Sequence, residues 1–287
     1  MSRSLPRKPT GAVLAGADVG TSLIKLAVRE GAGPARYDRV SAGDLAGAAA
    51  HLIASQPSRV GLTGGGAPRL ARLLRSDTAQ VAEFDAWAAG ARAMLHSEGP
   101  PERFLLVSLG TGTSALLVEP GNVRRVGGTA LGGGTLAGLG RALAGTSRFE
   151  ELAALARRGD RRRVDLLISD VYPEGGFQLP PDLNAASFAR LARLAESESP
   201  RAEDLAHALM GLVGENVALI CCGLAAAAQV ERIVFGGTPL RDNPALVDVL
   251  RLVCLALGRQ ATFLPHGEFA GALGALESVA ADVATRD

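Results

Sequence analysis

The sequence predicts an α/β fold made of two similar lobes that face each other across a cleft. Apolar runs of strand length alternate with segments of helical periodicity along the chain, and this alternation is typical of α/β proteins. One plan also occurs twice: an apolar run, a tip of glycine with threonine or serine, and a second apolar run, in GADVGTSLIKLAVRE (16–30) and VSLGTGTSALLVE (107–119). Because internal repeats indicate duplication, we expect one hairpin at the start of each lobe.

The individual elements follow from composition and period. Short runs rich in aliphatic and β-branched residues predict strands over 12–19, 23–30, 59–64, 104–110, 114–119, 124–129 and 232–237. Apolar residues at helical spacing predict helices over 43–55, 67–76, 85–96, 134–145, 148–158, 185–197, 203–229 and 244–257.

The predicted domains are a flexible tail over 1–12, an N-terminal lobe over 13–103 and a C-terminal lobe over 104–287. The stretch 157–183 is charged, then briefly apolar, then rich in proline and glycine. This composition is typical of an excursion from the core, and equally of a surface loop.

Composition excludes several classes of function. With 287 residues, 47% of them hydrophobic, the chain can build a sizeable core. A net charge of +1 and 4% aromatic residues offer no basic groove and no stacking surface, so nucleic acid is not an expected partner. The three cysteines lack metal-ligand spacing, which favours a reducing cytoplasm. No window approaches the roughly 20 apolar residues of a membrane span, so no membrane association is expected.

The two hairpin tips carry the residue types that bind phosphate. Glycine lets several backbone N–H groups point outward together, and threonine or serine hydroxyls add donors at the same place. Asp18 precedes the first tip and Lys25, one of only two lysines, follows it. A carboxylate there can hold Mg²⁺, and an ammonium can balance phosphate charge. Each tip alone is also typical of an ordinary turn, but the matched pair favours a clamp for a polyphosphate.

Two further glycine clusters lie in the second half. The segment 126–140 (VGGTALGGGTLAGLG) holds seven glycines between 127 and 140, and the segment 233–244 (IVFGGTPLRDNP) ends a strand just before a helix. Because glycine is entropically costly and sheet ends expose backbone to ligands, both segments predict close approach to a ligand or to a second backbone.

At this point the sequence resembles a known family, the type II pantothenate kinases, which have the acetate/sugar kinase–Hsp70–actin fold. The resemblance covers roughly residues 13–278 and rests on six motifs in order: DVGTSLIK (18–25), AEFDAWAAG (82–90), VSLGTGTS (107–114), RRVGGTALGGGTLAGLG (124–140), GDRRRVDLLISDVY (159–172) and VFGGTPLRDN (234–243). It implies a duplicated RNase H-like (actin-like ATPase) fold and ATP-dependent phosphorylation of pantothenate to 4′-phosphopantothenate, the first step toward coenzyme A.

The resemblance also implies roles for residues. ATP would contact Asp18, Gly20, Thr21, Ser22, Lys25, Thr111, Gly112, Gly133, Gly134, Thr135, Leu136, Ala137, Phe149, Gly237 and Thr238, with Asp18 also holding Mg²⁺. The catalytic residues would be Glu83, as the general base, and Arg125, which would also contact pantothenate. Ser114 would contact pantothenate too, and Tyr172 would reach toward the pantothenate pocket of the neighbouring subunit. Thr21 stands where the common family form has glycine, and Asn184 departs from the family's usual threonine.

The family further implies a homodimer through an excursion near 157–200, with coenzyme A and acyl-coenzyme A as candidate regulators. Two other functions stay open. One is a catalytically silent nucleotide- or acyl-coenzyme A-binding pseudokinase, suggested by the altered first tip. The other is a kinase for a different small hydroxyl substrate such as an amino sugar. Without the family motif, Asp85 would rival Glu83 as the base, and either acidic residue is also typical of a solvated helix start.

Overall fold

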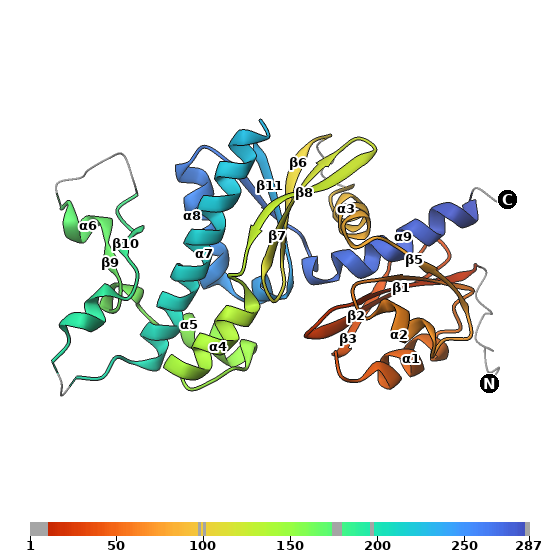
Figure 1. The fold of residues 1–287 in the computed structure, drawn as a ribbon, viewed down its shortest axis with the longest axis horizontal. Coiled ribbons are helices and arrows are strands. Elements are labelled where there is room, and N and C mark those ends of the chain that lie inside the picture. The colour runs from red at the N-terminus through yellow and green to blue at the C-terminus, as the bar shows by residue number, and fades with distance from the viewer. Residues whose placement is uncertain (1–10, 97–98, 100–101, 174–179, 196–197, 285–287) are drawn as a thin grey trace, which may run out of the picture. The chain divides into compact units, whose positions relative to one another are not determined.

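The computed structural model describes residues 11–96, 99, 102–173, 180–195 and 198–284. The chain divides into two compact units, residues 1–100 with 268–287, and residues 101–267. Each unit holds a five-stranded mixed sheet (Figure 1). Residues 1–10 of the predicted tail lie outside the described residues.

The sheet of the first unit has the order β3-β2-β1-β4-β5, in which β1, β2 and β3 are antiparallel and β1, β4 and β5 are parallel. Its strands are β1 (Val13–Val19), β2 (Leu23–Glu30), β3 (Arg36–Ser41), β4 (Arg59–Thr63) and β5 (Asp77–Gln80). The helices α1 (Leu45–Ala54) and α2 (Ala67–Ala71) cover one face, and α3 (Glu83–Met94) packs with α9 (Ala270–Ala284), which lies along β1 and β4 on the other.

The second unit repeats this topology. Its sheet has the order β12-β11-β6-β7-β8, in which β6, β7 and β8 are antiparallel and β6, β11 and β12 are parallel. The strands are β6 (Phe104–Leu109), β7 (Thr113–Glu119), β8 (Asn122–Thr129), β11 (Arg232–Gly236) and β12 (Gln260–Phe263). The prediction of a duplicated α/β architecture, with one hairpin at the start of each repeat, is confirmed.

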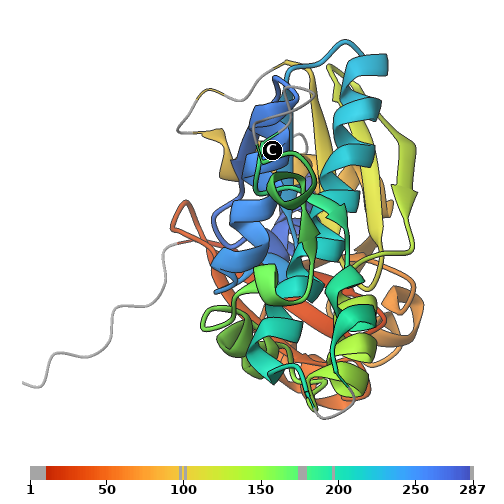
Figure 2. The same ribbon diagram turned by 90° about the vertical axis from the view of Figure 1, so that its left-hand side faces the viewer.

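The helices α4 (Gly133–Leu143), α5 (Phe149–Ala156), α7 (Ala202–Ala227) and α8 (Pro244–Ala256) belong to the second unit. Figures 1 and 2 show α7 running beside α8. Alternate residues of the central strands, including Leu105, Val107, Ala115 and Leu117, join α7 in one buried core. The strand residues between them therefore point to the opposite face of the sheet.

Helix α7 corrects the expectation about membrane spans. It is long and apolar enough to cross a bilayer, with a mean hydropathy of 1.8 over an 18-residue window, although 67% of that window is buried inside the protein. A core helix of a globular protein meets the same criteria, because it is apolar on nearly every side.

The placement of α9 corrects the predicted boundary of the C-terminal lobe. The prediction assigned all of 104–287 to that lobe, whereas residues 268–287 belong to the first unit. The reason is close packing between small residues. A Cβ on Gly16 or Gly61 of the sheet would collide with the backbone of α9, and a Cβ on Gly274 of α9 would collide with the carbonyl of Ala86 in α3. Helical periodicity alone does not assign a helix to a sheet more than 200 residues away.

The predicted excursion has short elements of its own: β9 (Leu166–Leu167), α6 (Ile168–Val171) and β10 (Asn184–Ala186). A helix over 185–197 was expected, and this is wrong. β10 pairs with β9, and Phe188 has a φ of 60°, a left-handed conformation that ends any regular element before the short 3₁₀ turn over Ala189–Arg193.

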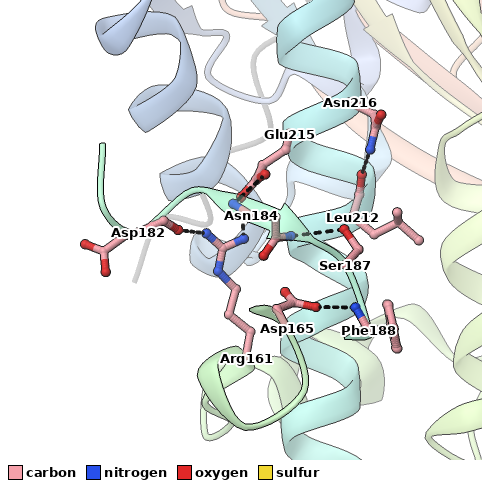
Figure 3. Close-up of polar contacts among 9 residues, drawn as sticks. All are labelled: Arg161, Asp165, Asp182, Asn184, Ser187, Phe188, Leu212, Glu215 and Asn216. Carbon is pink, nitrogen blue, oxygen red and sulfur yellow. Dashed lines mark hydrogen bonds and ion pairs between the residues drawn. The ribbon is translucent and has the colours of Figure 1, made fainter. Parts of the chain in front are cut away.

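A buried ion pair holds the excursion to α7 (Figure 3). Arg161 Nη1 donates to Glu215 Oε1 at 2.7 Å, and its Nη2 donates to the carbonyl of Asp182. Glu215 also accepts the N–H of Asn184, so one carboxylate joins the two ends of the excursion. Val171 and Tyr172 are 43% and 40% exposed. The expected dimer through 157–200 stays a prediction.

The seat of α9 is tested by Gly274→Ala. The added methyl group would overlap the carbonyl of Ala86, so we expect a loss of about 3 kcal/mol in the free energy of unfolding, measured by urea denaturation. Gly223→Ala in α7 is the matched control, because this helical glycine has open space around its Cβ position. There alanine should raise stability by up to about 1 kcal/mol. Equal effects of the two substitutions would contradict close packing at α9.

Candidate active site

The β1–β2 hairpin brings two predicted residues together. Asp18 and Lys25 are cross-strand partners, and their side chains form an ion pair with Lys25 Nζ 3.4 Å from Asp18 Oδ2. The two side chains are only 7% and 15% exposed. The tip closes where Gly20 N donates to Leu23 O, and a Cβ on Gly20 would lie 3.5 Å from the Lys25 ammonium. The ammonium therefore lies directly under the tip, where Thr21 and Ser22 are exposed.

The Asp18 carboxylate faces the start of α9. A Cβ on Gly271 would lie 3.0 Å from Asp18 Oδ2, so this glycine allows the first turn of the helix to approach the carboxylate. Burial raises the pKa of Asp18, and the nearby Lys25 ammonium opposes that rise. The partial positive charge at the N-terminus of α9 also favours the ionised form. Asp18 is thus a buried carboxylate held between two positive groups.

Glu83 joins this group from α3. It is the first residue of the helix. Loss of hydration raises the pKa of Glu83 and repulsion from Asp18 raises it further, while Lys25 lowers it. These effects place the three charged groups in one electrostatic cluster. Asp85 lies two residues further along α3, where a helix turns its side chain about 200° away from that of Glu83.

In the second unit, three segments predicted to bind ATP meet at the β6–β7 tip. Gly133 N donates to Gly110 O at 2.8 Å, and Gly134 N donates to Thr111 O at 2.9 Å. A Cβ on Gly132 would lie 2.8 Å from Gly112, so these two backbones are nearly in contact. The glycine-rich segment 132–134 therefore lies directly on the second tip.

The third segment is the turn at Gly237, which follows β11. Gly237 has a φ of 132°, and a Cβ there would collide with Leu109 O, while Pro239 contacts the Cβ position of Gly133. Thr238 begins a 3₁₀ turn at this place. Phe149, at the start of α5, is partly buried against the core of the unit, and its neighbour Glu150 pairs with Arg241 just beyond that turn.

The remaining residues of the glycine-rich segment differ in environment. Leu136 is fully buried in the core of the unit, so its side chain supports α4 and is not available to a ligand. Thr135 Oγ1 donates to Ala130 O at 3.2 Å and accepts Gly132 N at 3.3 Å, which fixes the start of α4. Ala137 lies on α4 and is partly exposed.

Two of the three predicted substrate residues lie on neighbouring strands. Ser114 is near the start of β7 and Arg125 lies within β8. Arg125 is an exposed residue, and none of the carboxylates that the structure describes forms an ion pair with it. Tyr172 ends α6, in the excursion. The structure does not bring Tyr172 together with Ser114 and Arg125 within the second unit.

Sequence analysis missed Thr63 and Trp87. Thr63 ends β4 as the cross-strand neighbour of Asp18, is 1% exposed, and its Oγ1 has no hydrogen-bond partner among the described residues. Trp87 is the only tryptophan, and its Nε1 lies 3.1 Å from the Cβ position of Gly271, next to Asp18. Thr63 could have been suspected, because a buried hydroxyl at a strand end is unusual. Trp87 carried no signal beyond the packing of an aromatic residue.

The fold and these two hairpins define a two-lobed protein of the actin-like ATPase and sugar kinase fold. Component A of (R)-2-hydroxyglutaryl-CoA dehydratase from Acidaminococcus fermentans superposes with a TM-score of 0.65 over 95% of this chain and 99% of that one, at 19% identity. A ROK family glucokinase from Streptomyces griseus superposes with a TM-score of 0.61 over 93% of this chain and 99% of that one, at 14% identity. At these identities the likeness shows the fold.

Sequence relatives give the family. The Fumble family model matches residues 91–278. The type II pantothenate kinase of Oceanobacillus iheyensis is 34% identical over 92% of this chain and 98% of that protein, and the one of Staphylococcus haemolyticus is 31% identical over 91% and 98%. The chain belongs to the type II pantothenate kinase family. The resemblance seen in the sequence motifs is therefore confirmed.

Substitution of two buried threonines tests whether the Thr63 hydroxyl lacks a hydrogen-bond partner in the protein and is therefore left for a ligand. Thr63→Val removes a hydroxyl without a partner among the described residues, so we expect unchanged stability or a gain of about 1 kcal/mol. Thr113→Val is the control, because Thr113 Oγ1 donates to Leu131 O at 2.7 Å. Its loss should cost about 1–3 kcal/mol. Thermal unfolding measures both, and an equal loss in Thr63→Val would show that its hydroxyl already has a structural partner.

Proposed function

We propose that this protein transfers the γ-phosphoryl group of ATP to the primary hydroxyl of pantothenate, giving 4′-phosphopantothenate and ADP. Membership of the family supports the substrate. The observation that carries the chemistry is the cluster of Asp18, Lys25 and Glu83, in which a buried ion pair lies beside a carboxylate of raised pKa. Groups with pKa values shifted by burial and by charged neighbours are typical of catalytic sites.

The chain's own donors suit a polyphosphate. In the first unit, the hydroxyl residues Thr21 and Ser22 are exposed at the tip, and the Lys25 ammonium lies beneath Gly20. In the second unit, the bonds from Gly133 N and Gly134 N hold the glycine-rich start of α4 against the tip at Thr111, where no side chain of these glycines would obstruct a phosphate. Phosphoryl transfer depends mainly on holding the phosphates and neutralising their charge, and these groups would do both.

The residues also fit Mg²⁺. This ion usually keeps several waters and is bound by one or two carboxylates together with substrate phosphates. Among the described residues, no three His, Cys, Asp or Glu side chains form a ligand cluster. A single carboxylate, Asp18, beside a phosphate-binding tip matches that donor set, and we infer that Asp18 would hold the ion. The ion would neutralise charge on the β- and γ-phosphates.

Glu83 is the proposed general base. The hydroxyl oxygen of the acceptor forms a bond to the γ-phosphorus, the bond to the bridging oxygen of ADP breaks, and the hydroxyl proton passes to the Glu83 carboxylate. A base with a raised pKa accepts this proton more readily than an ordinary glutamate. The Lys25 ammonium opposes the rise in the pKa of Glu83.

The base is tested by Glu83→Gln. We expect kcat to fall by about 10²–10⁴-fold in a coupled ADP assay, because glutamine cannot accept the proton. ATP binding should persist, and the single tryptophan Trp87 next to Asp18 allows it to be followed by intrinsic fluorescence. Asp85→Asn, in the same first turn of α3, is the control and should retain near-wild-type kcat. A fully active Glu83→Gln enzyme would exclude Glu83 as the base.

The same assay separates the competing functions. Wild-type protein should release ADP with pantothenate, and not with glucose or an amino sugar as acceptor. Fluorescence changes on ATP addition without ADP release from any acceptor would indicate the silent binding protein instead. Homodimerisation, location in the cytoplasm and regulation by coenzyme A or acyl-coenzyme A stay predictions that these assays do not address.

The acid limb of the pH profile gives a further test. A base works only when ionised, so kcat should fall as pH falls through the pKa of Glu83. Because loss of hydration and Asp18 raise that pKa, the limb should lie above the ordinary glutamate value of 4.5. We expect this in kcat at saturating ATP and pantothenate, with Asp85→Asn keeping the same limb. A profile flat down to pH 4.5 would contradict the raised pKa.

A further inference from the structure

The strand that carries Arg125 contains an irregularity. β7 and β8 pair in regular antiparallel register from Thr113 with Thr129 to Ala115 with Gly127, but the next pair is Leu116 with Arg125. Val126 therefore has no partner on β7. One extra residue in one strand of an antiparallel pair is a β-bulge, which turns the side chains beyond it to the opposite face of the sheet.

The bulge decides which face Arg125 occupies. Gly127 faces α7, because a Cβ there would collide with Leu224 at 2.6 Å, and Val126 packs against the same core. Counted back by strict alternation from Gly127, Arg125 would also point toward α7. With the bulge, Arg125 instead shares the face of Leu116, which is two residues from Ser114 on the same side of β7. Both predicted substrate residues thus face away from α7.

Gly128 decides how the guanidinium lies on that face. It is the cross-strand partner of Ser114 and has a φ of 152°. A Cβ on Gly128 would lie 2.8 Å from Arg125 Nη2 and 3.3 Å from Ser114 Cα, and it would also collide with Thr113 O. The guanidinium therefore occupies the space that any other side chain at position 128 would fill, beside Ser114.

We propose that the Val126 bulge and the bare Cα of Gly128 are positioning elements, which hold the Arg125 guanidinium beside Ser114 so that the enzyme selects an acceptor alcohol bearing a carboxylate. The inference rests on the proposed function. A guanidinium without a carboxylate partner among the described residues presents a planar set of donors, which suits bidentate pairing with a carboxylate. The hydroxyl of Ser114 adds a donor at the same place.

The test compares pantothenate with pantothenol, which carries a hydroxymethyl group in place of the carboxylate. For wild type we expect a higher kcat/KM with pantothenate. In Gly128→Ala, the ratio of the two kcat/KM values should fall about tenfold or more, because the charge-assisted contact is lost. The kcat/KM for pantothenol should fall much less than the kcat/KM for pantothenate. A purely structural defect would lower both acceptors equally and would overturn the inference.

Gly121→Ala is the matched control. Gly121 lies in the turn of the same β7–β8 hairpin, also has a positive φ (67°), and has open space at its Cβ position. Alanine at this position also takes a positive φ, although 67° is less strained for alanine than 152°. It does not meet Arg125, so its selectivity ratio should equal that of wild type. A fall as large as that in Gly128→Ala would overturn the inference.

Should Gly128→Ala fail to fold, as judged by circular dichroism, Ser114→Ala and Arg125→Ala form a double-mutant cycle on kcat/KM for pantothenate. Side chains that share one carboxylate should give effects that differ from additivity by more than about threefold. Additive effects would overturn the inference. Wild-type protein without pantothenate-dependent ADP release would overturn the proposed function, whereas an active enzyme whose selectivity survives Gly128→Ala would overturn this inference alone.

Discussion

The close seat of α9 on β1 and β4 is the constraint on which the site in the first unit depends. Gly16 and Gly61 on the sheet, with Gly90 on α3 and Gly274 on α9, remove the side chains that would separate these backbones. Helix α9 can then begin next to the Asp18 carboxylate. Helix α3 packs on α9 and places Glu83 in the same electrostatic cluster as Asp18 and Lys25. A close-packed interior cannot take an added side chain without a shift of the backbone. The positions of the Asp18 and Glu83 carboxylates therefore depend on glycines that are not themselves site residues.

The two units share a topology, but their hairpin tips are held by different physical means. In the first unit the hairpin tip stands over a buried charge pair, so electrostatics dominates. In the second, the tip is fixed by backbone hydrogen bonds from Gly133 and Gly134 and by the bond from Thr113 Oγ1 to Leu131 O. A duplicated framework explains this division, because each hairpin inherits its place in the sheet while its residues remain free to differ.

Local sequence patterns were sufficient for what depends on local structure. The alternating strands and helices, the repeated hairpin and the motifs that carry Asp18 and Glu83 could all be predicted. The pairing of α9 with a sheet formed more than 200 residues earlier could not, because no local period records which sheet a helix covers. The short elements around Phe188 were mistaken for a helix, since helical spacing outweighed a left-handed residue and a strand pairing that only the tertiary structure shows. The bulge at Val126 was equally invisible, because it is defined by the register of a second strand.

Departures from ordinary packing rules gather on one row of the first sheet. Lys25, Asp18 and Thr63 are cross-strand neighbours on β2, β1 and β4. The row holds a buried ion pair, a carboxylate of raised pKa and a buried hydroxyl without a partner among the described residues. Removing charges and hydroxyls from water costs free energy that apolar residues of similar size would not cost. A fold selected only for stability would not keep three such groups side by side. Their placement at the N-terminus of α9, beside the tip that we propose to bind phosphate, is explained if the ligand supplies the missing partners.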